Sequence, residues 1–186
     1  MTHHGPNPTA QELRSLIERI ARVMASEEWA EDLNPAQSAA LGYLARANRF
    51  SRKPSVVAEY LGTTRGTASQ TLKALDRKGL VAEEADPSDR RSISYSVTPK
   101  GQEMLARQRG FDAAVSALPE PAAQALGEAL AALARSMLEA REMRGFGLCA
   151  TCRHHETTAA GPRCGLLNVA LSAQDASEIC VDHSAR

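Results

Sequence analysis

The stretch TTRGTASQTLKALDRKGLVAEEADPSDRRSISYSVTPKGQEML, residues 63–105, changes its hydrophobic period twice and so decides the fold. Its first part has a narrow apolar stripe at helical spacing, which is typical of a helix that buries one side. The stripe consists of Ala68, Leu72 and Leu75. The segments 80–85 and 92–98, around the turn DPSDRR, have the short apolar pattern of strands. We therefore predict a helix followed directly by a two-stranded hairpin.

The other side of this helix carries short hydroxyls, an amide and cations, the groups that read base edges in the major groove of DNA. These candidate DNA-binding residues are Thr64, Arg65, Thr67, Ser69, Gln70 and Lys73. The short apolar segment VVAEYL before it completes a helix-turn-helix. Arg90 and Arg91 at the hairpin tip can reach phosphates or the minor groove. The whole pattern predicts a winged helix-turn-helix that binds duplex DNA, and a purely protein-binding winged helix is the alternative.

The remainder of the chain is mainly helical by its periodicity, with alanine and leucine dominant. Helices are predicted over 9–28, 35–47, 98–117 and 119–144, with Thr9 and Asn34 as caps of the first two. The expected fold class is mainly α, with a two-stranded wing, long dimerisation helices and a small Cys-rich metal-binding appendage. The expected boundaries are 1–34 for an N-terminal dimerisation helix, 35–100 for the winged helix-turn-helix, 101–145 for C-terminal dimerisation helices and 146–186 for the tail.

Charge is distributed unevenly along a chain of zero formal net charge. Residues 46–78 hold eight Lys or Arg against two Asp or Glu, which indicates either a local anionic partner or a solvated helical face. No apolar run approaches the length that crosses a bilayer, and the first residues lack the pattern of a signal peptide. We expect a cytoplasmic protein without a membrane partner.

Residues 63–105 resemble the recognition helix, wing and following helix of the MarR family of bacterial transcription regulators. The resemblance runs from about residue 9 to 142, and its most specific part is Asp89-Arg90-Arg91 followed by Thr98-Pro99-Lys100-Gly101. It implies a homodimer whose first and last helices interlock and whose two winged helices bind a palindromic operator. It also implies that Asp89 holds the wing, that Arg90 or Arg91 reaches DNA, and that the protein is a regulator and not an enzyme.

All four cysteines lie in the last part of the chain, in the pattern C-x2-C-x11-C-x15-C. The candidate metal ligands are Cys149, Cys152, Cys164 and Cys180. Four thiolates suit an iron–sulfur cluster or a tetrahedral zinc ion, and the single late cysteines favour the cluster. Metal-free thiol chemistry stays open, as does a role for His154, His155 or His183 as a ligand. A tail this short needs such a staple in order to fold.

The functional hypothesis is a homodimeric repressor whose DNA affinity depends on a redox- or iron-sensing centre in the tail. One alternative keeps the DNA binding, makes the metal a structural zinc and leaves the signal to an organic effector. Another is a dithiol oxidoreductase built on Cys149-Ala150-Thr151-Cys152, which the absence of a preceding predicted strand disfavours.

Overall fold

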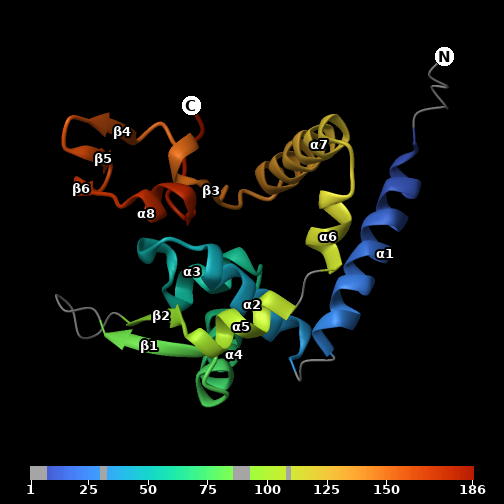
Figure 1. Ribbon diagram of the computed structural model, residues 1–186, viewed down its shortest axis with the longest axis horizontal. Helices are drawn as coiled ribbons and strands as arrows, with labels where there is room; N and C mark the ends of the chain where they lie inside the picture. The colour runs from blue at the N-terminus through green and yellow to red at the C-terminus, as the bar shows by residue number, and fades with distance from the viewer. Residues whose placement is uncertain (1–7, 30–32, 86–92, 108–109) are drawn as a thin grey trace.

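The computed structural model of the chain describes residues 8–29, 33–85, 93–107 and 110–186 (Figure 1). The helices are α1 (Ala10–Trp29), α2 (Pro35–Arg46), α3 (Pro54–Tyr60), α4 (Arg65–Arg77), α5 (Pro99–Arg107), α6 (Gly110–Ser116), α7 (Glu120–Glu139) and α8 (Ala173–Ser177). The strands are β1 (Val81–Ala85), β2 (Ile93–Val97), β3 (Gly147–Leu148), β4 (His155–Thr158), β5 (Gly161–Cys164), β6 (Val169–Ala170) and β7 (Ile179–Cys180). Two single turns of 3-10 helix are η1 (Arg49–Ser51) and η2 (Cys149–Thr151).

Helices α2, α3 and α4 pack together with the hairpin to form the main hydrophobic core. The predicted stripe of α4, Ala68, Leu72 and Leu75, is completely buried in it. Asn34 caps the start of α2 with a capping box. Its side chain accepts from the backbone N–H of Gln37, and the Gln37 side chain accepts from the backbone N–H of Asn34. This part is the predicted winged helix-turn-helix.

Strands β1 and β2 form the predicted antiparallel wing, with Val81 opposite Val97. Tyr95 on β2 is buried, and its hydroxyl donates to Glu83 Oε2 at 2.7 Å. Its backbone N–H donates to the carbonyl oxygen of Arg52 at 3.1 Å, which ties β2 to the segment before α3. The hairpin tip, with Arg90 and Arg91, lies outside the described residues.

Gly101 in α5 allows a close approach between this helix and the wing. A Cβ at this position would collide with the carbonyl oxygen of Leu80 and lie 2.7 Å from Val97 Cγ1. We expect Gly101→Ala to lower the free energy of unfolding by about 1–3 kcal/mol, because the backbone must shift. Urea unfolding measures this, with Gly127→Ala as the control, since Gly127 lies in a helix with nothing within 4 Å of its Cβ position. An equal loss in both variants would contradict the packing argument.

Helices α1, α6 and α7 extend away from the winged helix (Figure 1). Helices α5 and α6 cover most of the predicted helix over 98–117, and residues 108–109 between them lie outside the described residues. The apolar side chains of α1 and α7 remain exposed in the single chain. They include Leu16, Ile20 and Val23 on α1 and Leu126, Leu130, Leu133 and Met137 on α7.

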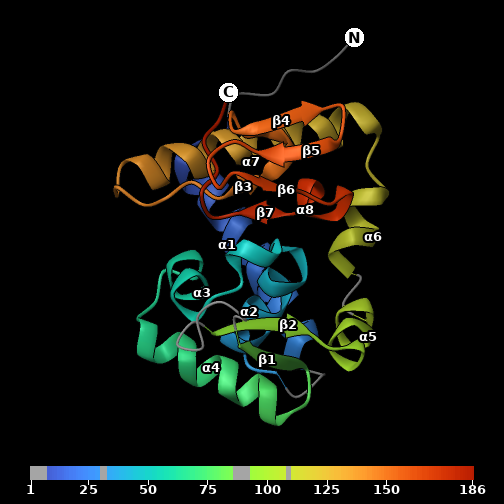
Figure 2. The same cartoon turned by 90° about the vertical axis from the view of Figure 1, so that its left-hand side faces the viewer.

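The tail after α7 is a small unit of short strands. Strands β4, β5 and β6 form one antiparallel sheet in that order, and β3 pairs antiparallel with β7. This unit lies against the end of the winged helix that carries α3, and α4 lies at the opposite end (Figures 1 and 2). Within the described part of the chain, no helix has the length and apolar character needed to span a bilayer.

Candidate functional site

The exposed side of α4 is the candidate DNA-binding face. Arg65, Thr67, Gln70 and Lys73 are exposed there, and Ser69 is half-buried. Arg77 is also exposed one turn after Lys73, and sequence reasoning did not choose it as a DNA-binding residue. The sequence spacing could have identified Arg77, because residues 70, 73 and 77 are three and four positions apart and therefore share a helix face.

Two of the predicted hydroxyl groups are occupied within the helix itself. Thr64 caps α4, since its Oγ1 accepts from the backbone N–H of Thr67 at 3.1 Å. The hydroxyls of Thr64 and Thr67 are also hydrogen-bonded to each other, at 2.9 Å. The capping role accounts for Thr64 structurally, so Arg65, Gln70 and Lys73 are the stronger candidates for contacts with DNA.

Two arginines of the basic segment 46–78 form ion pairs with carboxylates of the tail. Arg49 Nε lies 3.5 Å from Asp175 Oδ1, and Arg52 donates to Glu178 with a closest distance of 3.4 Å. Asp175 and Glu178 are both buried polar residues of the tail, and without the tail Arg49 and Arg52 would each lose a charged partner. Two of the cations that predicted an anionic partner are therefore paired with carboxylates of the same chain.

The four cysteines come together in the tail, where they form the cysteine cluster. Cys149, Cys180 and Leu171 are buried in one small core, against which Cys164 and Phe50 pack. Cys152 is buried and follows Cys149 around the turn η2, where its N–H donates to the Cys149 carbonyl at 3.0 Å. All four are free thiols.

Backbone N–H groups point at the sulfur atoms of this cluster. The N–H of Ser184 donates to Cys152 Sγ at 3.4 Å, and the N–H of Leu167 donates to Cys164 Sγ at 3.5 Å. A backbone hydrogen bond from Asp182 lowers the pKa of Cys180 against the larger effect of burial, which raises it. Amide hydrogen bonds stabilise thiolates and tune bound iron or zinc, so the surroundings suit charged sulfur.

The Cys149 thiol is nevertheless neutral in the metal-free chain. Burial, together with electrostatic repulsion from Cys180, Cys164 and Cys152, raises the pKa of Cys149 to about 11. Over the described residues, no group of three or more His, Cys, Asp and Glu side chains is arranged to hold a metal ion. The thiols therefore share one pocket without converging on one point.

Two unpaired nitrogen atoms test whether this pocket fits a bound group. Among the described residues, Asn48 Nδ2 and His155 Nε2 are the buried side-chain atoms without a hydrogen-bond partner. His155 lies opposite Cys164 in the β4–β5 pair, and Asn48 lies beside Cys180. Both unpaired nitrogens thus adjoin cysteines of the cluster, where buried polar groups need a partner. The donor set and these orphan atoms fit a thiolate-bound metal group.

The three histidines near the cluster differ in position. His183 packs over Gly147, and its Nε2 is hydrogen-bonded to Thr151 Oγ1 at 2.9 Å. His154 contributes its carbonyl oxygen, which accepts from the N–H of Gly165 at 2.8 Å. His155, opposite Cys164, is the histidine whose ring leaves a buried nitrogen unpaired.

Aromatic side chains hold the start of the tail on the winged helix. Tyr43 of α2 and Tyr60 of α3 stack with ring centroids 4.1 Å apart. Phe146 meets both rings edge-on, at 6.0 and 5.1 Å. Most of the few aromatics of this chain are therefore used in internal packing.

Comparison with known proteins agrees with this geometry. Residues 31–92 match the sequence model of the MarR family. The winged helix is therefore similar to that of the MarR family over these residues. A solved complex of Staphylococcus aureus MepR with DNA is 25% identical, over 70% of this chain and 99% of that one, with a TM-score of 0.54. The MarR family transcription regulator SP03579 is 21% identical, over 71% and 89% of the two chains, with a TM-score of 0.57 and hence a shared fold. No curated protein sequence matches the chain.

These similarities confirm the expected mainly helical winged-helix fold. The match agrees with the expectation of a regulator and not an enzyme, and it covers the winged helix without reaching Cys149 or Cys152. The MarR match ends at residue 92, so the tail and its cysteines stand outside it.

Proposed function

We propose that the protein is a homodimeric transcription regulator that binds a palindromic DNA operator through α4 and the wing. The observation that carries this proposal is the exposed row of Arg65, Gln70, Lys73 and Arg77 on a MarR-family winged helix. An amide and several cations on one helix face suit base and phosphate contacts in the major groove. The similar structure of MepR in complex with DNA supports the same use of this fold.

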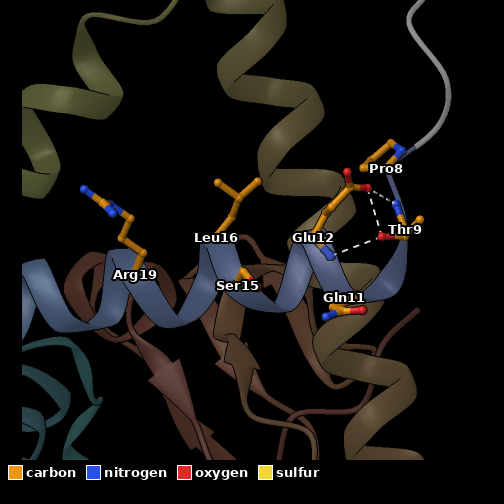
Figure 3. A pocket seen from close by; sticks show the side chains of 7 residues that line it. All are labelled: Pro8, Thr9, Gln11, Glu12, Ser15, Leu16 and Arg19. Atoms are coloured by element: carbon orange, nitrogen blue, oxygen red, sulfur yellow. Dashed lines mark hydrogen bonds between the residues drawn. The ribbon is translucent and has the colours of Figure 1, made fainter.

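A second copy of the chain is proposed to cover α1, α6 and α7. An apolar groove of about 400 Å³ lies between α1 and α6, with Leu16, Ile20, Phe111 and Leu118 among its walls. A hollow of about 890 Å³ near the start of α1 is lined by Pro8 and residues of this helix, including Leu16 and Arg19 (Figure 3). Exposed apolar surface of this extent is typical of an interface.

The cysteine cluster is proposed to hold a metal centre whose state sets the DNA affinity, so that the protein acts as a repressor sensing redox or iron. An iron–sulfur cluster is favoured, with zinc as the alternative. Cys149, Cys152, Cys164 and Cys180 would be the ligands, supported by their shared pocket and the N–H groups directed at sulfur.

The chain's own residues account for the consequences of binding. An iron–sulfur cluster supplies reversible one-electron chemistry, or lability towards oxidants, when bound. Binding deprotonates the thiols, whose raised pKa otherwise keeps Cys149 neutral. The amide groups of Leu167 and Ser184 then face charged sulfur. Without the centre, the Cys149 thiol would be neutral, and the tail would lose the stabilisation that metal binding supplies.

Two substitutions on α4 test the DNA-binding proposal. We expect Lys73→Ala to weaken binding to all DNA sequences by a similar factor. The slope of log affinity against log salt concentration is expected to fall by about one, which corresponds to one lost phosphate contact. We expect Gln70→Ala to lower the preference for the selected operator by about 1–3 kcal/mol, because an amide reads base edges. Fluorescence anisotropy with a duplex selected by the purified protein from random DNA measures both effects over a range of salt concentrations.

Arg163→Ala is the matched control for charge, because Arg163 is exposed on β5 at the end of the molecule away from α4. Its affinity and salt dependence are expected to equal those of the wild type. Wild-type affinities in both α4 variants would contradict the assignment of α4 as the DNA-binding helix.

A further inference from the structure

One wall of the cysteine cluster belongs to the winged helix. The turn η1 joins α2 to α3 and contacts β7. Phe50 in this turn packs against Cys149, Cys180 and Leu171. The cluster therefore lies at an interface with the DNA-binding domain.

Backbone hydrogen bonds fix Cys180 against this wall on both sides. The N–H of Asn48 donates to the carbonyl oxygen of Ile179 at 2.9 Å. The N–H of Val181 donates to Ser51 Oγ at 2.9 Å in a buried position. Because the two bonds flank Cys180, its sulfur cannot move far without disturbing residues 48–51.

The Asn48 side chain lies next to the sulfur of Cys180. Asn48 is completely buried, and its Oδ1 accepts from Ser51 Oγ at 2.8 Å. Its Nδ2 makes no hydrogen bond within the usual limits. The backbone hydrogen bond from Asn48 to the Ile179 carbonyl places this buried donor beside Cys180. The amide is thus available to donate to a thiolate at this position.

We propose that Asn48 is a positioning residue of the cysteine centre, whose side-chain amide donates to the Cys180 thiolate and thereby couples the centre to the winged helix. This inference rests on the proposed metal function of the cluster. A neutral thiol gives the amide a weak acceptor, whereas a metal-bound thiolate gives it a strong one. The corner of residues 47–53 therefore gains or loses a buried hydrogen bond with the state of the centre.

The same corner is bonded to the elements that position DNA contacts. The Ser51 carbonyl accepts from the hydroxyl of Tyr43 in α2 at 2.8 Å. The Arg52 carbonyl accepts from the N–H of Tyr95 in the wing strand β2 at 3.1 Å. Residues 48–52 thus contact the tail on one side and α2 and the wing on the other.

Metal release from Asn48→Asp tests the proposal. Aspartate keeps the shape and the oxygen that accepts from Ser51, but it removes the donor and places a negative charge beside the thiolate. We expect the holoprotein variant to lose its iron or zinc to excess EDTA about 10–100-fold faster than the wild type. Arg49→Ala is the matched control, because it breaks the ion pair with Asp175 across the same interface without touching a cysteine.

Each outcome has a distinct meaning. Fast release in Asn48→Asp with near wild-type release in Arg49→Ala supports the proposal. Equal release in Asn48→Asp and the wild type overturns it while leaving the metal centre intact, and equally fast release in both variants reduces Asn48 to a docking residue. A wild type without bound iron or zinc overturns both this inference and the proposed centre.

Hydrogen exchange of the wild type keeps the proposal falsifiable if Asn48→Asp does not fold. Removing the metal is expected to abolish protection at the backbone amides of Asn48, Val181 and Tyr95, which bond to or from this corner. Loss of protection confined to the tail sheet β4–β6, with Asn48 and Tyr95 unchanged, would overturn the coupling.

Discussion

Replacing Cys164 by serine is expected to abolish the proposed metal centre and to unfold the tail. Cys164 lies outside the Cys149–Cys152 turn but packs against the same small core. Structural metal sites contribute on the order of 10 kcal/mol to the folding of the segment that holds them. We expect iron and zinc contents near zero, loss of amide protection over the tail and operator affinity reduced about 5–150-fold, the range of ordinary allosteric coupling.

Thr157→Ala is the control for Cys164→Ser, since Thr157 is exposed on β4. Its metal content and operator affinity are expected to match the wild type. Full metal content in Cys164→Ser would show that this thiol is not a ligand. Unchanged operator affinity after complete metal loss would leave the centre structural and without influence on DNA binding.

Leu130→Glu is expected to convert the dimer to a monomer and to abolish tight operator binding. Leu130 lies in the middle of the exposed apolar row of α7, together with Leu126, Leu133 and Met137. A charge buried in an interface without a partner is strongly unfavourable. A monomer presents only one winged helix to the operator. Losing the second, linked half-site contact is expected to lower the operator affinity about 10²–10⁴-fold. Sedimentation equilibrium and anisotropy titration measure the two effects.

Gln124→Glu adds a charge to the opposite side of α7, where Gln124 donates to Glu128. This control is expected to remain dimeric and to bind the operator normally. A monomeric Gln124→Glu variant, or a dimeric Leu130→Glu variant, would place the interface elsewhere.

The sequence predicted local features well because they depend on neighbouring residues. The stripe of Ala68, Leu72 and Leu75 identified α4 and its buried side, and Asn34 identified the start of α2. Strand alternation located β2, whose Tyr95 is buried as the pattern requires.

Contacts between distant segments could not be predicted from the sequence. From the sequence alone, Arg49 and Arg52 belong to a basic segment. Their carboxylate partners, Asp175 and Glu178, lie more than a hundred residues later in the chain. The importance of Asn48 had no sequence signal either, because its partners Ile179 and Cys180 are brought to it only by the docked tail. Periodicity and ligand spacing describe a segment, whereas docking depends on two surfaces at once.

The central claim is that the state of the cysteine centre sets DNA affinity. The most direct test is one anisotropy titration of the selected duplex with wild-type protein purified without oxygen, before and after removal of its iron or zinc, at one fixed salt concentration. We predict that the holoprotein binds about 5–150-fold more tightly than the stripped protein and that reloading restores the affinity. Identical binding curves for the loaded and stripped protein would contradict the account.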